Sequence, residues 1–194
     1  SPSRRAEGME TGIEMLHGEN PGSFVVRAND LDFEVDLFDG QKTGLYLDQL
    51  QSHAEVAKLA KGKRVLDCFT NQGGFALACA KAGAAKVTAV DVSATACEAA
   101  RQNTKLNGLE IDVIEHNVFD FLKHAEPEYD LIILDPPSFT RNKKTLMDAM
   151  RGYKEIHLRS LKLLEIGGIL STFCCSHHAS RELFLENLAD ASVD

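Results

Sequence analysis

Two aspartates follow predicted strands, and a glycine-containing turn lies between them. Asp67 follows a short apolar run, the turn T-N-Q-G-G occupies residues 70–74, and Asp91 ends the segment K-V-T-A-V-D about twenty residues later. Carboxylates at the carboxyl ends of parallel strands can hold ribose hydroxyls, and glycines let backbone approach a ligand closely. The pattern predicts a nucleoside-binding site. The alternative is an ordinary strand-to-helix loop that binds no ligand. The dinucleotide fingerprint G-x-G-x-x-G is absent.

A third polar group follows another apolar run, L-I-I-L, as the segment D-P-P-S-F at 135–139. The two prolines supply no N–H groups and stiffen the loop, so we expect Asp135 to face the same cleft. Phe139 could stack on an unpaired base. The alternative is a rigid connection with Phe139 in the core.

An alternation of strands and helices must position these groups. Strands are predicted at 65–66, 86–90, 111–114, 131–134 and 169–175, with Gly167-Gly168 as the turn before the last. Helices are predicted at 75–81, about 94–106, from 118, about 145–164 and from about 181. Right-handed crossovers then predict an α/β fold with a doubly wound, mostly parallel sheet, preceded by a β-hairpin that turns at Asn29-Asp30.

The composition limits the classes of function that this chain could have. The 194 residues carry 21 Lys and Arg against 29 Asp and Glu, and this net charge of −8 does not favour nucleic-acid binding, although a local basic face is compatible with it. The five cysteines form no C-x-x-C pattern, so we expect neither a metal site nor a disulfide framework. No apolar run could span a bilayer and no signal peptide is visible, so we expect a cytoplasmic protein.

Together, Asp67, Asp91 and the D-P-P-S-F loop resemble a class I S-adenosylmethionine-dependent methyltransferase with a Rossmann-like fold. Three further stretches are similar to the RlmI-like family, which makes 5-methylcytosine in large-subunit ribosomal RNA: G-Q-K-T-G-L-Y-L-D-Q at 40–49, R-G-Y-K at 151–154 and G-G-I-L-S-T-F-C-C-S at 167–176. The resemblance covers Val35 to Leu188. It implies S-adenosyl-L-methionine as cofactor and ribosomal RNA, single-stranded or remodelled, as partner, and it is compatible with a homodimer.

The resemblance also implies a role for each matching residue. The methionine part of the cofactor would meet Asp67, Phe69, Thr70, Asn71 and Gly73. The ribose would be held by Asp91, the adenine flanked by Val92 and Ser93, and its edge met by Asn117 and Val118. The entrance would be lined by Lys42, Thr43, Tyr46 and Gln49, and the target base faced by Asp135 and Pro136. The family has Asp in place of Asn117, and either side chain can accept a hydrogen bond from the adenine amine.

A cysteine would act as nucleophile. Cytosine C5 is a poor nucleophile until a thiolate adds to C6, which makes the ring an enamine. Cys174 and Cys175 end the last predicted strand, where neighbouring side chains point to opposite faces, so only one should reach the base. The family pattern selects Cys175, and the other four cysteines are expected in the core. Asp135 would protonate or hydrogen-bond the base at N3.

The resemblance divides the chain into a tail or linker remnant (1–22), a β-hairpin with an entrance loop (23–49) and a cofactor-binding methyltransferase domain (50–194). Family members carry an RNA-binding domain before this segment and further sheet strands after it, so the last domain is expected to be C-terminally incomplete. Two alternatives remain open. One is an RNA amino-methyltransferase acting on guanine or adenine, which needs no cysteine, and the other is a non-catalytic RNA-binding module.

Overall fold

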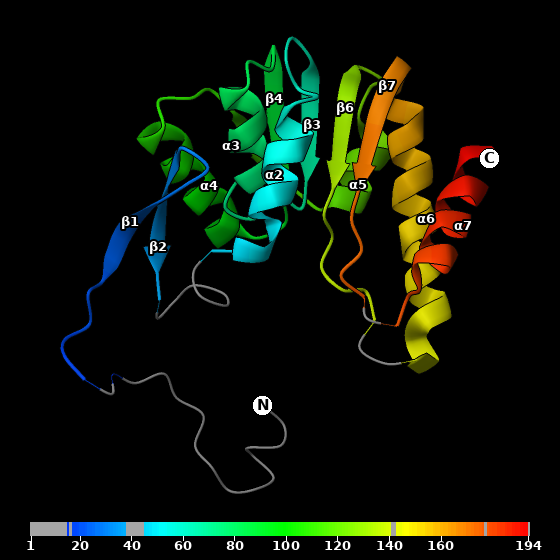
Figure 1. Cartoon of the computed structure of the whole chain (residues 1–194). Coiled ribbons are helices and arrows are strands. Elements are labelled where there is room, and N and C mark those ends of the chain that lie inside the picture. The colour runs from blue at the N-terminus through cyan, green and yellow to red at the C-terminus, as the bar shows by residue number, and fades with distance from the viewer. Residues whose placement is uncertain (1–14, 16, 38–44, 141–142, 177, 194) are drawn as a thin grey trace, which may run out of the picture.

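A five-stranded parallel sheet, in the order β5-β4-β3-β6-β7, forms the centre of the molecule (Figure 1). The computed structural model describes residues 15, 17–37, 45–140, 143–176 and 178–193. The strands are β3 (Arg64–Cys68), β4 (Lys86–Asp91), β5 (Asp112–Glu115), β6 (Tyr129–Leu134) and β7 (Leu164–Thr172). The chain winds outward from β3 to β5 and then returns to β6, so the winding direction reverses between β3 and β6. The predicted doubly wound α/β fold is confirmed.

Helices cover both faces of this sheet. One face carries α2 (Leu50–Ala57), α3 (Gly74–Lys81) and α4 (Ala94–Leu106), and the other carries α5 (Val118–His124) and α6 (Leu146–Leu163), with α7 (Arg181–Val193) packed on α6. Two short 3-10 helices, η1 (Leu47–Gln49) and η2 (Lys143–Thr145), precede α2 and α6. The central strands β3 and β6 are buried along most of their length, as the inner strands of a parallel sheet are. None of the helices in the described part of the chain has the length and apolarity to cross a membrane.

The predicted hairpin is also present, as β1 (Ser23–Ala28) and β2 (Leu31–Asp36). Asn29 and Asp30 have φ angles of 51° and 60°, the left-handed pair that a two-residue hairpin turn needs. Two asparagines, one within α4 and one at its C-cap, bind β2 through their side-chain amides. The side-chain oxygens of Asn107 and Asn103 accept from the backbone N–H groups of Asp32 and Glu34, each at 2.9 Å.

The last strand differs from its prediction. β7 begins at Leu164, three residues before the predicted glycine turn, and it ends at Thr172. A register shift opposite Tyr129 and Leu131 of β6 absorbs Gly167-Gly168 within the strand, as β-bulges do. Cys174 and Cys175 therefore lie beyond the ladder, in the loop that follows it, and the alternation of strand side chains cannot decide which of them faces the cleft.

Candidate active site

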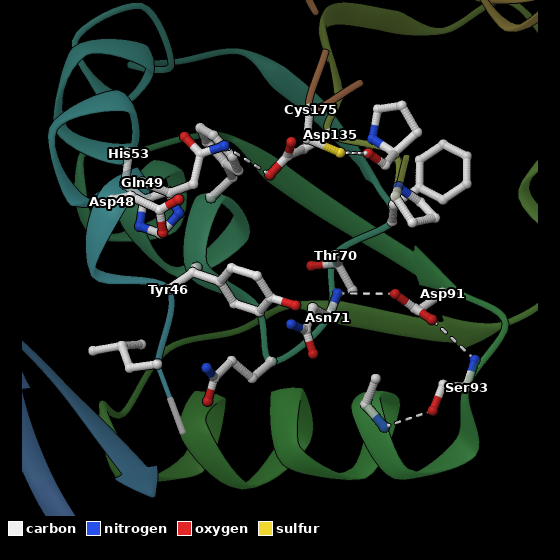
Figure 2. Close-up of a pocket in the computed structure, with 18 of the residues that line it drawn as sticks. Tyr46, Asp48, Gln49, His53, Thr70, Asn71, Asp91, Ser93, Asp135 and Cys175 are labelled. Atoms are coloured by element: carbon white, nitrogen blue, oxygen red, sulfur yellow. Dashed lines mark hydrogen bonds between the residues drawn. The ribbon is translucent and has the colours of Figure 1, made fainter. Parts of the chain in front are cut away.

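A cavity of about 520 Å³ opens at the carboxyl edge of the sheet, where β3 and β6 lie side by side (Figure 2). This is the reversal point at which open α/β sheets bind ligands, and the volume lies in the range of small-molecule sites. The wall comes from the loop after β3, the start of α3, the ends of β4 and β6, the Cys175 loop, and the segment from Leu45 to His53. Segments far apart in sequence therefore meet around one space.

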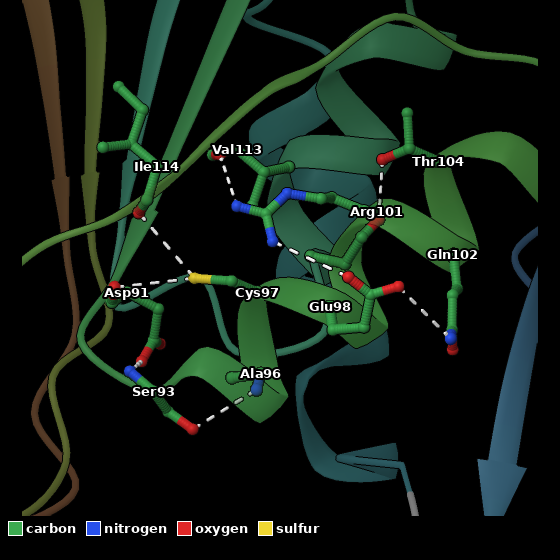
Figure 3. A network of polar contacts seen from close by, with 11 residues as sticks. Asp91, Ser93, Ala96, Cys97, Glu98, Arg101, Gln102, Thr104, Val113 and Ile114 are labelled. Atoms are coloured by element: carbon green, nitrogen blue, oxygen red, sulfur yellow. Dashed lines mark hydrogen bonds and ion pairs between the residues drawn. The ribbon is translucent and has the colours of Figure 1, made fainter.

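Asp91 is fixed at one side of this cavity. One carboxylate oxygen accepts from the backbone N–H of Asn71 and the other from that of Ser93, both at 2.9 Å. Ser93 also caps α4 through Ala96 N, and the Cys97 thiol donates to the Asp91 carbonyl at 3.5 Å (Figure 3). Each carboxylate oxygen keeps a further lone pair, so Asp91 can accept hydrogen bonds from ligand hydroxyls without moving.

Asp67 lies beneath the cavity. It is 1% exposed, and its Oδ2 accepts from Thr70 Oγ1 at 2.6 Å and from the backbone N–H of Ala76 at 3.0 Å. Its Oδ1 is buried without a partner among the described residues. Burial raises the pKa of Asp67 to about 7. The two hydrogen bonds act in the opposite direction, and repulsion from Asp135 and Asp91 adds to the rise. These bonds tie the turn to the start of α3, and the predicted contact with the methionine part of a cofactor stays a prediction.

Asp135 and Cys175 meet at the end of the cavity above β6 and β7. The Cys175 thiol donates to the Pro136 carbonyl at 3.4 Å, and the amide of Gln49 donates to Asp135 Oδ2 at 3.2 Å. A second link joins the same two loops, because Ser138 Oγ lies 3.1 Å from Ser176 Oγ. The thiol and the carboxylate thus come from different strands but are held beside one another (Figure 2).

Cys175 is the exposed member of the five cysteines, as expected for a nucleophile. Cys68, Cys79 and Cys97 are buried, and burial raises the pKa of all three, that of Cys79 to about 12. Cys174 is half-buried against the core of α6 and β6. The predicted core placement is confirmed for the three buried cysteines.

Eleven of the predicted site residues line the cavity: Tyr46, Gln49, Phe69, Thr70, Asn71, Asp91, Val92, Ser93, Asp135, Pro136 and Cys175. Gly73 lies behind the wall as the left-handed N-cap of α3 (φ 89°). Lys42 and Thr43 lie outside the described residues. Phe139 packs 4.7 Å from Tyr153, measured between ring centroids, so its ring belongs to the core instead of facing a base.

Asn117 and Val118 also lie away from this wall. Val118 is buried in the core, and Asn117 caps α5. The side-chain oxygen of Asn117, predicted to accept from the adenine amine, instead accepts from the backbone N–H groups of Phe119 and Asp120 at 2.9 and 3.3 Å. The side chain could still contact adenine through its N–H₂ group. Its oxygen, however, already accepts two hydrogen bonds from the start of α5, which competes with the predicted acceptor role.

Sequence reasoning missed His53 in the cavity wall. The residue lies in α2, four positions after Gln49, which is the N-cap of that helix, and both residues line the cavity. Its ring is buried, stands edge-on to Phe75 at 4.4 Å between centroids, and has its pKa lowered to about 4 by burial. The four-residue spacing from Gln49 could have indicated that His53 lines the cavity. The same spacing also fits a histidine packed in the core.

The sequence matches the model of the S-adenosylmethionine-dependent methyltransferase family over residues 5–193. It is 44% identical over 199 residues to ribosomal RNA large subunit methyltransferase I of Shewanella denitrificans, and 41% identical over 198 residues to that of Aeromonas salmonicida. The alignments cover 99% and 98% of this chain but 50% of each relative, so the chain spans about half the length of these proteins. The solved structure of SMU.776, assigned as a methyltransferase and crystallised with SAH, aligns with a TM-score of 0.79 and 28% identity, over 91% of this chain and 48% of that one. On this evidence the chain belongs to the family of S-adenosylmethionine-dependent methyltransferases.

Proposed function

We propose that this site methylates C5 of a cytosine in large-subunit ribosomal RNA through a covalent adduct of Cys175. The observation that carries the proposal is the placement of an exposed thiol beside a carboxylate, Asp135, in the cavity that also holds Asp91. The names of the curated relatives support ribosomal RNA as the substrate. An amino-methyltransferase would have no use for the thiol.

The residues present fit S-adenosyl-L-methionine. Asp91 offers fixed acceptors for ribose hydroxyls, and Val92 and Ser93 offer an exposed edge beside it for the adenine. Three carboxylates, Asp67, Asp91 and Asp135, lie in or beneath the wall, which suits a ligand that carries positive charge. When bound, this cofactor supplies an electrophilic methyl group on a sulfonium centre.

The chain's own groups would prepare and release the base. The Cys175 thiolate adds to C6, and the electron pair displaced from the C5–C6 double bond makes C5 nucleophilic. Asp135 would act in its protonated form, and its donation of a hydrogen bond or a proton to N3 would neutralise the negative charge that thiolate addition places on the ring. After C5 is methylated, loss of its proton to a base restores the double bond and expels the thiolate. We assign no residue to that proton.

The RNA must present the target base unpaired, because a cytosine stacked in a duplex cannot reach the Cys175 loop. We therefore expect a single-stranded or remodelled segment of ribosomal RNA as the partner, and action in the cytoplasm. A homodimer is a further expectation of the family resemblance, and sedimentation of the free protein tests it.

Replacement of Cys175 tests the chemistry, with its neighbour as a matched control. Cys175→Ala should abolish methyl transfer and still bind SAH, whereas Cys174→Ala should retain transfer. RNA carrying 5-fluorocytosine at the target should form a covalent adduct with the natural protein and none with Cys175→Ala, because fluorine cannot leave as the proton does. Continued methylation by Cys175→Ala would indicate an amino-methyltransferase. Failure of the natural protein to bind the cofactor would indicate a non-catalytic binding module.

A further inference from the structure

Helix α6 holds the Cys175 loop on both sides of the thiol. Tyr153 and His157 lie one helical turn apart on α6, which packs beside β7 (Figure 1). His157 Nε2 lies 2.9 Å from Oγ1 of Thr172, the last residue of β7. The Tyr153 hydroxyl lies 3.2 Å from Oγ of Ser176, the residue that follows Cys175. The short loop from Thr172 to Ser176 is therefore attached to one helix at both of its ends.

His157, which anchors the first end, is itself fixed. Its Nδ1 lies 3.2 Å from Asn187 Oδ1, while the N–H₂ group of Asn187 donates to the Met150 carbonyl at 2.8 Å. Burial lowers the pKa of His157 to about 4, so the ring is neutral at pH 7. Since an amide oxygen can only accept, Nδ1 carries the proton and Nε2 accepts from the hydroxyl of Thr172. Both ring nitrogens are thus used, one toward α7 and one toward β7.

The second anchor continues as a chain of hydroxyl groups with a fixed direction. Ser176 Oγ lies 3.1 Å from Ser138 Oγ, which donates its one proton to the Thr140 carbonyl at 2.7 Å. Ser138 then accepts from Ser176, and Ser176, whose proton is used, accepts from Tyr153. Burial raises the pKa of Tyr153, so its hydroxyl keeps the proton with which the chain begins.

This hydroxyl chain joins the two loops that carry the reacting groups. Ser138 belongs to the D-P-P-S-F segment that begins with Asp135, and Ser176 follows Cys175. The Cys175 thiol spans the same two loops, because it donates to the Pro136 carbonyl at 3.4 Å. A thiol is a weak donor, so this bond alone would hold the loops loosely. Ser176 is only 4% exposed, and water therefore competes little for the bonds of the hydroxyl chain.

We propose that Tyr153 and Ser176 are positioning residues for the nucleophile, because their hydroxyl groups hold the Cys175 loop against the D-P-P-S-F loop. This inference rests on the proposed function, since it takes Cys175 as the attacking group. Neither hydroxyl takes part in the bond changes. Loss of either hydroxyl frees the loop, and the thiolate then lies less often beside Asp135 in the geometry that addition to C6 requires.

Removal of the Tyr153 hydroxyl tests the positioning role. Tyr153→Phe keeps the buried ring and should lower kcat about two- to tenfold, the value of one neutral hydrogen bond, with unchanged SAH affinity and unchanged KM for RNA. The rate of adduct formation with 5-fluorocytosine RNA should fall by the same factor, since addition to C6 is the step that needs the thiol in place. Ser176→Ala, which removes no ring, should lose at least as much. The double variant should be no slower than Ser176→Ala alone, because either substitution opens the chain.

Tyr129→Phe is the matched control. Tyr129 is also buried, and its hydroxyl is hydrogen-bonded to Thr88, but it begins β6 at the edge of the sheet opposite the cavity. Its replacement should lower stability in urea unfolding about as much as Tyr153→Phe does and should leave kcat unchanged.

Four results would overturn the positioning role and leave the proposed function intact. They are an unchanged adduct rate in both Tyr153→Phe and Ser176→Ala, weaker SAH binding by Tyr153→Phe, an equal fall of kcat in Tyr129→Phe, and a double variant slower than Ser176→Ala. Absence of any adduct with the natural protein would overturn both proposals.

Discussion

Asp67→Asn should change the pH dependence of folding stability, because the carboxyl of Asp67 is buried with one oxygen unpaired. Its pKa is raised from 3.8 to about 7 in the folded protein. Between these values the folded state keeps a proton that the unfolded state has released. The contribution of Asp67 is therefore fully present below about pH 4, falls as the pH rises through this window, and is lost above about pH 7.

The size of the effect follows from the shift in pKa. One pKa unit corresponds to 1.36 kcal/mol, so a shift from 3.8 to about 7 amounts to about 4 kcal/mol over the full window and about 3 kcal/mol between pH 5 and pH 8. Asn has the shape of Asp and no titration. Its oxygen can accept from Thr70 and Ala76 as Oδ2 does, and its N–H₂ group takes the place of the unpaired oxygen.

Urea unfolding at pH 5, 6, 7 and 8 measures this difference. The stability of Asp67→Asn relative to the natural protein should rise by about 3 kcal/mol across that range. His53 and His157, whose pKa values burial lowers to about 4, titrate alike in both proteins and cancel in the difference. Asp130→Asn is the control: hydrogen bonds from Arg64 lower the pKa of Asp130 to about 2, so its difference should stay flat above pH 5. A flat difference for Asp67→Asn would refute the reasoning, since it would mean that the buried carboxylate is already ionised at pH 5.

Three further substitutions test the packing around the site. Gly74→Ala should shift the ring of His53 and change stability in urea unfolding by less than about 1 kcal/mol, because the end of a side chain can give way and Ala favours the helix by about 1 kcal/mol; a loss above about 3 kcal/mol would show that the ring is held rigidly. Asn103→Ala removes the amide that bonds Glu34 N and the Gln72 carbonyl and should cost about 2–3 kcal/mol by the same assay; a cost below about 0.5 kcal/mol would contradict its buried role. Tyr153→Phe removes the hydroxyl 3.2 Å from Ser176 Oγ and should lower kcat severalfold with unchanged SAH affinity, whereas weaker SAH binding would place its effect at the cofactor.

The carboxyl edge of the sheet was predictable because its signals are local. An apolar run followed by Asp is enough to place Asp91 and Asp135, and parallel order then brings them to one edge. Asp67 carries the same local signal but is buried under Thr70. A strand-end position therefore indicates the edge on which a side chain lies, but the fold of the following turn decides whether it reaches the cavity.

Other features depend on contacts that no local pattern encodes. The orientation of Cys175 was predicted from strand alternation and the family pattern, but the loop containing Cys175 is held by bonds to Pro136 and Ser138 from another strand. The sequence position of Asn117 fits either a ligand contact or a helix cap. In the structure its side-chain oxygen accepts hydrogen bonds from two backbone N–H groups of α5. His53 becomes visible as a site residue only when α2 is packed against Gly74.

Asn103 gives the hairpin a connection to the cofactor turn. Its fully buried amide accepts from Glu34 of β2 and donates to the carbonyl of Gln72, within the turn that carries Asn71. This side chain adds a direct polar link to the apolar contact that the hairpin already makes with α3. We therefore expect a filled cavity to reduce the motion of the hairpin as well as that of the turn.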